Sequence, residues 1–381
     1  MEMDKFLERK LSGIKEHNLL RELKEIGFVS SRFIECEGKK YINFSGNGYL
    51  GDLYQILNFK YQNYKCRQGA TASRLVVGNR DIHNKLEKAL SEFKGKEAAL
   101  VFPSGYQTDV GVISALVDNE DCVVIDRLVH ASIVDGCRLS GAKILIFKHN
   151  DVDSLRDVLE KRTKFKNCLV ITESLFSMDG DLAPLREMVP IIKKYNSWFM
   201  VDEAHASGVF GKEGRGLIHQ YGLENDIDVI VSTLSKVFGG QGGYVAGSKQ
   251  LIDYLVNTSR GFIYSTGISP VLCEYALSIL ESVKKVDDRR KKVLELAGYL
   301  KKELQKNGFN TLKSESQIVP IVIGSNEKVL EVAEKLRDDG IWVVAIRYPT
   351  VRRGQSRLRI SLNADHQGED VDRLVDVLRS L

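Results

Sequence analysis

A lysine flanked by small hydroxyl residues directly follows an apolar run. Residues 232–236 read Ser-Thr-Leu-Ser-Lys, the apolar residues 229–231 precede them, and the glycine-rich residues 238–243 come next. A covalently bound pyridoxal phosphate needs an amine of lowered pKa, hydroxyls for its phosphate and backbone that bulky side chains leave open. Lys236 meets these needs, although a surface lysine in a loop is the commoner explanation for this segment taken alone.

A carboxylate and a histidine follow a second apolar run. Residues 198–201 are apolar, and Asp202 and His205 come after them. A carboxylate there can pair with a pyridinium nitrogen and keep it protonated, so that the ring withdraws electrons. The histidine three residues later can reach the phenolic oxygen of the same cofactor. Together with Lys236, this pair favours a pyridoxal-phosphate site.

Two further polar positions come after apolar runs. After residues 98–102, Ser104 and Gly105 open a predicted helix whose free N–H groups, including that of Tyr106, are suited to a phosphate. His130 also follows an apolar run, and a histidine there can stack on a ring and move a proton. The competing interpretations are an ordinary helix cap for Ser104 and a structural role for His130.

These positions belong to a regular series of short apolar runs. The spacing of roughly 20 to 30 residues leaves room for a helix between consecutive strands, which is typical of a mainly parallel, buried sheet. In such a sheet, ligands bind at the carboxyl ends of the strands. The sequence therefore predicts an α/β fold with one site at that edge, and the runs are residues 98–102, 122–125, 144–147, 168–171, 198–201 and 228–231.

The two ends of the chain show a different pattern. An amphipathic stretch at 3–26 and a hairpin at 31–43 predict an N-terminal arm over residues 1–45. Residues 46–270 are then the large domain. Residues 271–381 are predicted to form a smaller α+β domain, with strands at 318–323, 341–346 and 357–362 and helices at 326–339 and 369–381.

Composition argues against two classes of partner. The 381 residues include 55 Lys and Arg against 51 Asp and Glu, and the net charge of +4 predicts no nucleic-acid partner. The longest uncharged stretch, residues 261–273, is shorter than the roughly 20 apolar residues that a membrane span needs. We therefore expect neither nucleic-acid nor membrane binding.

The cysteines and histidines predict neither disulfides nor a metal site. The seven histidines show no ligand spacing such as HExxH. The N-terminus begins with charged residues rather than an apolar export signal, which predicts a reduced, cytoplasmic protein. Each cysteine is expected to be a small buried apolar residue, and the six are Cys36, Cys66, Cys122, Cys137, Cys168 and Cys273.

With these positions in place, the chain resembles the α-oxoamine synthases, a family of fold-type I pyridoxal-phosphate enzymes, from about residue 15 to the end. The resemblance implies a fold-type I transferase with a large domain around a mainly parallel sheet and a smaller C-terminal α+β domain. It also implies pyridoxal 5'-phosphate as cofactor and a homodimer with composite active sites. The matching stretches are 47–51 (Asn-Gly-Tyr-Leu-Gly), 69–74 (Gly-Ala-Thr-Ala-Ser-Arg), 172–181, 264–266 and 357–359.

The resemblance gives the candidate residues roles around the cofactor. Lys236 would bind it covalently and act as the base, while Asp202 would contact the ring nitrogen. His205 and Ser177 would hydrogen-bond the phenolic oxygen, and His130 would stack on the ring and donate a proton toward a thioester carbonyl. The phosphate would be held by residues of two subunits, namely Gly105, Tyr106, Thr233, Ser235 and, from the neighbouring subunit, Thr266.

The resemblance also implies which residues bind the substrates. Arg359 would bind the carboxylate of the amino acid, because a guanidinium matches it with two hydrogen bonds, and Asn47 and His130 would assist. Arg21 and Thr350 match family positions that contact the second substrate or the product.

One stretch indicates the reaction within the family. Residues 345–351 (Ala-Ile-Arg-Tyr-Pro-Thr-Val) are most similar to the members that condense L-alanine with pimeloyl-CoA, or a pimeloyl carrier protein, in biotin biosynthesis. That condensation releases CoA and CO2. A glycine C-acetyltransferase or a synthase of broad acyl-CoA range would share every cofactor residue. A non-catalytic subunit is the third alternative, disfavoured because Lys236, Asp202 and His205 are all present.

Three residues depart from the family pattern. Gly48 stands where an aspartate is usual, Thr71 belongs to a pair that is usually richer in glycine, and Arg352 takes the place of a proline. The first two affect the conformation of loops. Arg352 would add a cation near the expected acyl-CoA channel.

Overall fold

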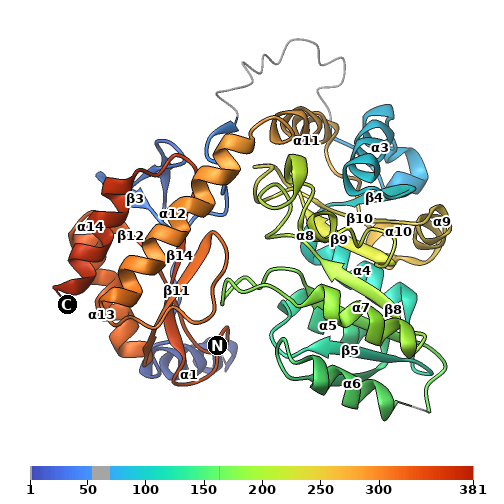
Figure 1. Cartoon of the computed structure of the whole chain (residues 1–381), viewed down its shortest axis with the longest axis horizontal. Helices are drawn as coiled ribbons and strands as arrows, with labels where there is room; N and C mark the ends of the chain where they lie inside the picture. The colour runs from blue at the N-terminus through green and yellow to red at the C-terminus, as the bar shows by residue number, and fades with distance from the viewer. Residues whose placement is uncertain (1, 54–68, 163, 381) are drawn as a thin grey trace. The chain divides into compact units, whose positions relative to one another are not determined.

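The computed structural model describes residues 2–53, 69–162 and 164–380, which form two compact units (Figure 1). The smaller unit comprises Met1–Asp52, Met178–Asp181 and Lys291–Leu381, and the larger comprises Leu53–Ser177 and Leu182–Arg290. The N-terminal residues group with the C-terminal ones because their strands pair. The predicted domain boundaries at residues 45 and 270 stay a prediction.

The larger unit is built on a seven-stranded sheet in the order β4-β10-β9-β8-β7-β5-β6. β10 is antiparallel to both of its neighbours, and the pairs from β9 through β8, β7 and β5 to β6 are parallel. The predicted mainly parallel sheet of an α/β fold is therefore confirmed. Its strands are β4 (Ala98–Phe102), β5 (Cys122–Asp126), β6 (Lys143–Phe147), β7 (Cys168–Glu173), β8 (Trp198–Asp202), β9 (Val229–Thr233) and β10 (Gly243–Gly247).

Burial on both faces explains why most of these strands could be predicted. Every residue of β5, β7 and β9 is buried, so each reads as an unbroken apolar run. β10 was not predicted, because its sequence begins with glycine. A Cβ on Gly243 would lie 2.4 Å from Thr108 Oγ1 and 2.6 Å from the Cα of Gly105, so the close approach of this strand to the next helix requires glycine.

Helices connect the strands of the larger unit. The one that matters most for the site, α4 (Gly105–Leu116), packs against α5 (Ala131–Ser140) and lies along β9 and β10. The others are α3 (Asp81–Lys94), α6 (Val152–Glu160), α7 (Leu185–Lys194), α8 (Leu217–Tyr221), α9 (Lys249–Thr258), α10 (Arg260–Ile263) and α11 (Pro270–Val283), with short turns η1 (Arg74–Gly78) and η2 (Lys212–Gly214).

The smaller unit contains two sheets. The first has the order β1-β2-β3-β12 and the second β11-β14-β13. The predicted hairpin at 31–43 is confirmed as β2 and β3. The predicted single strand at 341–346 is wrong, because β12 pairs with β3 while β13 pairs with β14. The strands are β1 (Gly27–Phe28), β2 (Phe33–Cys36), β3 (Lys39–Asn43), β11 (Ile318–Gly324), β12 (Ile341–Trp342), β13 (Val344–Ile346) and β14 (Ser356–Ser361).

Four helices accompany these sheets. α12 (Asp287–Lys306) begins in the larger unit, and α13 (Asn326–Asp338) and α14 (Gly368–Arg379) confirm the two predicted C-terminal helices. α1 (Glu2–Glu16) covers only the first part of the predicted amphipathic stretch, and none of its residues is buried. The apolar face of such a helix is not buried in its own unit, so it can pack against another protein surface.

The described cysteines are free and buried, which confirms the predicted burial for Cys36, Cys122, Cys137, Cys168 and Cys273. Cys66 lies outside the described residues. Within the described part of the chain, no helix combines the length and the apolar character that crossing a membrane requires.

Candidate active site

A cavity of about 270 Å³ lies at the carboxyl edge of the sheet in the larger unit. Residues from β7, β8, β9, α4 and α5 meet there, as expected for ligand sites in sheets of this type. The lining residues are Ser104, Gly105, Tyr106, Asp109, His130, Ser132, Glu173, Asp202, Ala204, His205, Val231, Ser232, Thr233, Ser235 and Lys236.

Lys236 stands on a tight loop that leaves the end of β9. The hydroxyl of Thr233 donates to the carbonyl of Gly242 at 2.9 Å, and its oxygen lies 2.7 Å from the hydroxyl of Ser235. The N–H of Leu234 donates to the same carbonyl of Gly242 at 2.9 Å. These bonds close the loop, so Lys236 projects from a fixed backbone with two hydroxyls beside it.

Asp202 ends β8, one strand away, and His205 follows on a turn. The Oδ1 atom of Asp202 accepts from the N–H of Ala204 at 2.7 Å, and both Asp202 and His205 are buried. A Cβ on Gly208, at the end of this turn, would lie 2.4 Å from a side-chain carbon of Val237. Only glycine allows the turn to pack this closely against the residue next to Lys236.

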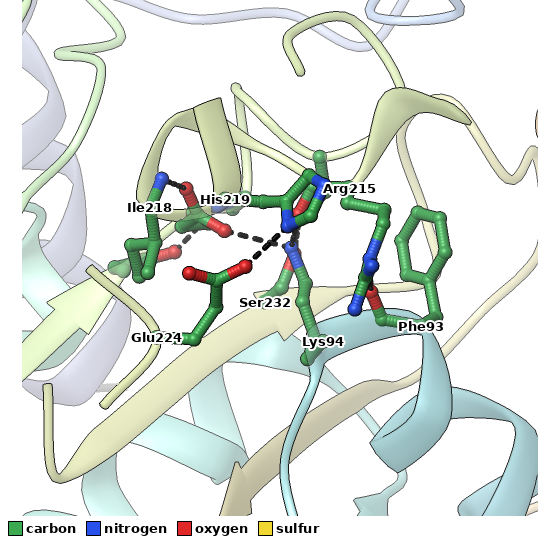
Figure 2. Close-up of polar contacts among 11 residues, drawn as sticks. Phe93, Lys94, Arg215, Ile218, His219, Glu224 and Ser232 are labelled. Atoms are coloured by element: carbon green, nitrogen blue, oxygen red, sulfur yellow. Dashed lines mark hydrogen bonds and ion pairs between the residues drawn. The ribbon is translucent and has the colours of Figure 1, made fainter. Parts of the chain in front are cut away.

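A buried ion pair supports this turn from within the protein (Figure 2). The ammonium of Lys94 donates to Glu203 Oε2 at 2.8 Å, to Ser207 Oγ at 2.6 Å and to the carbonyl of Arg215 at 2.8 Å. Ser232 donates to Ser207 at 2.9 Å. We call Lys94, Glu203, Ser207 and Ser232 the ion-pair cluster.

The ion-pair cluster connects three segments that carry candidate residues. Glu203 follows Asp202 directly, and its Oε1 also accepts from the N–H of Ile218 at 2.9 Å. Ser232 precedes Thr233 on β9. Burial is the largest single influence on the pKa of Lys94 and lowers it. The charges and hydrogen bonds of Glu203 and Tyr244 together outweigh burial, so the net shift is upward and the ammonium stays charged.

The first turn of α4 presents backbone N–H groups to the cavity. Ser104 caps the helix by accepting from the N–H of Gln107 at 3.1 Å, and Gly105 and Tyr106 begin it. A Cβ on Gly105 would lie 3.4 Å from Thr233 Oγ1, so the helix start and the β9 hydroxyl face the same space. A helix N-terminus with adjacent hydroxyls is suited to a phosphate.

His130 caps α5 and lines the cavity from the side of β5. Its Nδ1 lies 2.7 Å from the hydroxyl of Ser132 and 3.3 Å from the N–H of that residue. Burial lowers the pKa of His130, and the charge of Lys236 lowers it further, while Asp202 and Asp135 raise it. The net downward shift favours the neutral imidazole.

Two carboxyls in the cavity were not predicted as site residues. Asp109 on α4 and Glu173 at the end of β7 are both buried, and one oxygen of each has no hydrogen-bond partner among the described residues. Burial raises the pKa of each well above its usual range, and the nearby charge of Asp202 raises it further. We call Asp109, Glu173 and Asp202 the acid cluster.

Among the described residues, the acid cluster does not have the arrangement of a metal site. No group of three or more histidine, cysteine, aspartate or glutamate side chains within the described ranges is arranged to hold a metal ion. A signal for Glu173 was present in the sequence, because it ends an apolar run as Asp202 does. Asp109 stands one helical turn after Gly105, but one carboxyl on a predicted helix does not indicate which cavity it faces.

Two predicted cofactor residues, Ser177 and Thr266, are not among the lining residues. Thr266 forms an isolated β-bridge with Ser73, and Gly267 donates to the carbonyl of Ala72 at 3.0 Å. Nearby, Thr71 has a φ of 63°, a left-handed conformation that β-branched residues rarely adopt. The departure from a glycine-rich pair thus places a threonine where glycine fits better.

Of the predicted substrate residues, His130 belongs to the larger unit, and the other four belong to the smaller unit. Both terminal nitrogens of Arg359 donate to Asn47 Oδ1 at 3.1 Å, and Nη1 also donates to Ser361 at 2.8 Å. Arg347 connects the segments of Arg21 and Thr350, since it donates to the carbonyls of residues 18 and 20, at 2.5 and 3.3 Å, and accepts from the N–H of Thr350.

Curated relatives match the chain over nearly its whole length. A protein named 8-amino-7-oxononanoate synthase from Treponema denticola is 42% identical over 98% of this chain and 95% of its own. One of the same name from Thermoanaerobacter pseudethanolicus is 40% identical, over 96% of this chain and 94% of its own.

Solved structures share the whole fold, and a family model covers most of the chain. Serine palmitoyltransferase from S. paucimobilis, with a bound PLP–myriocin aldimine, is 29% identical with a TM-score of 0.91, over 99% of this chain and 97% of its own. 8-Amino-7-oxononanoate synthase from Francisella tularensis is 26% identical with a TM-score of 0.74, over 89% of this chain and 97% of its own. The aminotransferase class I and II model matches residues 39–378. The chain therefore belongs to the aminotransferase class I and II family, as the resemblance to its α-oxoamine synthase branch predicted.

Proposed function

We propose that this protein is a pyridoxal-phosphate enzyme that condenses L-alanine with pimeloyl-CoA, or a pimeloyl carrier protein, to give 8-amino-7-oxononanoate, CoA and CO2. The observation that carries the proposal is the cavity itself, where Lys236 and Asp202 come from neighbouring strand ends beside the start of α4. The full-length identity of about 40% to synthases of that name supports the choice of substrates.

The donors and acceptors of the cavity fit the proposed cofactor. The N–H groups of Gly105 and Tyr106, with the hydroxyls of Thr233 and Ser235, would hold its phosphate. Asp202 would pair with the ring nitrogen, and a Cβ-free Gly105 keeps the phosphate end open. When bound, pyridoxal phosphate draws electrons from the substrate bond that breaks at the α-carbon.

The side chains around the ring would orient the cofactor and move protons. His205 and Ser177 would hydrogen-bond the phenolic oxygen. Lys236 would hold the cofactor covalently through Nζ, and its amine would be the base for the α-proton of alanine. His130 would stack on the ring and donate a proton toward the thioester carbonyl; its neutral imidazole does so as a hydrogen-bond donor.

Arg359 would bind the carboxylate of alanine. Its guanidinium is buried and already oriented by Asn47 and Ser361, so little side-chain freedom is lost on binding. Arg21 and Thr350 would contact the acyl substrate or the product, and the bonds of Arg347 to both segments support a shared role.

We also propose a homodimer in which Thr266 reaches the cofactor phosphate of the neighbouring subunit. Three consecutive apolar side chains of η1 are exposed, with Val76 at 72%, and the apolar residues of α1 are exposed as well. Exposed apolar side chains grouped on one element, as on η1, are typical of interfaces. Light scattering after size exclusion checks the dimer, and Val76→Lys is expected to weaken it.

The free, buried cysteines support a reducing compartment, so we place the enzyme in the cytoplasm.

The test is a visible spectrum of the holoenzyme with alanine, glycine and serine added in turn, followed by an assay of CoA release. Alanine should change the spectrum, and CoA release should depend on pimeloyl-CoA. Lys236→Ala should lose turnover. Faster turnover with glycine and acetyl-CoA would contradict the proposed substrates, and turnover by Lys236→Ala would contradict the role of the lysine.

A further inference from the structure

A chain of hydrogen bonds leads from a buried carboxyl to the imidazole that lines the cavity. The Oδ2 atom of Asp109 lies 2.5 Å from Ser132 Oγ, and Ser132 Oγ lies 2.7 Å from Nδ1 of His130. All three residues belong to the larger unit, and Asp109 and Ser132 are 2% and 1% exposed. We call this the Asp109–Ser132–His130 chain.

The carboxyl at the start of this chain lies in surroundings that favour its neutral form. Its Oδ1 has no hydrogen-bond partner among the described residues, and burial of an incompletely paired carboxylate disfavours the charged form. The facing charges are Asp202, which opposes ionisation, and Lys236, which favours it, and the carboxyl of Glu173 also faces Asp109. Burial and Asp202 outweigh Lys236 and the Ser132 hydrogen bond, and the pKa of Asp109 rises.

The proton on Asp109 decides the direction of the whole chain. If Asp109 were a carboxylate, the Ser132 hydroxyl would donate to it and accept from Nδ1–H, so Nε2 would be left without a proton. If Asp109 is a neutral acid, its O–H donates to Ser132, the hydroxyl donates to Nδ1, and the imidazole proton resides on Nε2.

The backbone geometry favours the second direction. The N–H of Ser132 also points to Nδ1 of His130, at 3.3 Å, and this contact is a hydrogen bond only when Nδ1 carries no proton. Glu173 accepts the backbone N–H of His130, which fixes the backbone of this residue. The imidazole is therefore fixed by its backbone and by Nδ1.

We propose that Asp109 is a positioning residue that acts, as a neutral acid and through Ser132, to keep His130 in the tautomer that presents an Nε2–H donor to the cavity. The inference rests on the proposed function, because it assigns the source of the hydrogen bond toward the thioester carbonyl. No proton is consumed in this step, since the chain only orients the donor.

Two variants of Asp109 distinguish a role as hydrogen-bond donor from a role as anion. Asp109→Asn replaces the acid O–H with an amide N–H, so it can still donate to Ser132 but can never be an anion. Asp109→Leu has neither donor nor acceptor and is of similar size. Ser132→Ala breaks the chain in the middle. Ser114→Ala is the control, since Ser114 donates within α4 to the carbonyl of Val110.

The readout is the nitrogen chemical shifts of His130 in holoenzyme labelled with ¹⁵N-histidine, assigned with His130→Asn. Wild type, Asp109→Asn and Ser114→Ala should show the proton on Nε2. Ser132→Ala and Asp109→Leu should show a mixture or Nδ1–H, with kcat reduced by about tenfold or more and KM changed less. The kcat of Asp109→Asn should be clearly higher than that of Asp109→Leu.

Two results would overturn the proposal. One is an Nδ1–H tautomer in the wild type together with an Asp109→Asn variant as impaired as Ser132→Ala, which would make Asp109 an anion. The other is a folded Ser132→Ala protein with an unchanged tautomer. Because the spectrum needs no acyl substrate, the expected shifts in a protein that does not condense alanine would support the chain and overturn only the proposed substrates.

Discussion

Two buried polar clusters lie next to each other in the larger unit, and they differ in how their charges are paired. In the ion-pair cluster, the ammonium of Lys94 makes three hydrogen bonds and both oxygens of Glu203 accept one. In the acid cluster, Asp109 and Glu173 each keep one oxygen without a partner among the described residues. Asp202 of the acid cluster and Glu203 of the ion-pair cluster are consecutive residues.

This difference indicates that the ion-pair cluster has a structural role and that the acid cluster belongs to a binding site. Buried polar atoms are nearly always hydrogen-bonded in folded proteins, and exceptions require an explanation. The ion-pair cluster follows this rule, so it holds the turn after β8 in place. The acid cluster departs from it where Lys236 and His130 line a cavity, which is where strained or unpaired groups serve function.

The largest expected effect comes from breaking the ion pair. Lys94→Met removes the ammonium at nearly constant volume and leaves Glu203 as an unpaired buried carboxyl. Removing one partner of such a pair costs about 3–5 kcal/mol, so the free energy of unfolding in urea should fall by that amount. A loss below about 1 kcal/mol would show that this ion pair stabilises the fold no more than a surface salt bridge does.

A double substitution sharpens the same point. Lys94→Met combined with Glu203→Gln leaves no unpaired charge, so the double variant should be more stable than the sum of the single losses predicts. We expect a coupling of roughly 0.5–3 kcal/mol between these contacting residues. Additive losses in a urea double-mutant cycle would mean that the two charges stabilise the turn independently.

The acid cluster should respond to pH in the opposite way to an ordinary salt bridge. Because the folded-state pKa values of Asp109 and Glu173 are raised, the folded apoprotein holds protons that the unfolded chain releases above about pH 4. Its stability should therefore fall as the pH rises from there toward the raised values. The charges that face them are Asp202 and Lys236, and Asp109 and Glu173 also face each other.

Replacing these carboxyls with neutral amides should remove the dependence of stability on pH. Glu173→Gln and Asp109→Asn should each make the slope of unfolding free energy against pH less negative, by up to about 1.4 kcal/mol per pH unit. Urea unfolding of the apoprotein at several pH values between 4 and 8 measures the slopes. Unchanged slopes in both variants would mean that these carboxyls titrate in the folded protein as they do in the unfolded chain.

The same contrast explains what the sequence could predict. Asp202, His130 and Lys236 each follow an apolar run that becomes a buried strand, so the edge where they meet follows from the alternation of strands and helices. The ion-pair cluster and the Asp109–Ser132–His130 chain depend on contacts between distant elements. Lys94 and Glu203 are 109 residues apart, and nothing near either in sequence indicates the partner.

Glycine-rich segments were the other source of error. The run before β10 fits a loop and a phosphate-binding turn as well as a strand, and only the close approach of Gly243 to α4 shows why a strand begins there. The split of residues 341–346 into β12 and β13 has a similar cause, since pairing with two different sheets is not encoded in an apolar run.

The smallest expected effect compares one chemical change in the two clusters. Ser232→Ala and Ser132→Ala each remove a hydroxyl that is 1% exposed. Ser232 donates to Ser207, which keeps its bond to Lys94, so its loss should cost about 1 kcal/mol of unfolding free energy and leave the His130 tautomer on Nε2. Ser132→Ala should change the tautomer, because among the described residues its hydroxyl connects Asp109 to Nδ1 of His130. A tautomer change in Ser232→Ala would show that the two clusters act as one network, and the distinction between support and site would then fail.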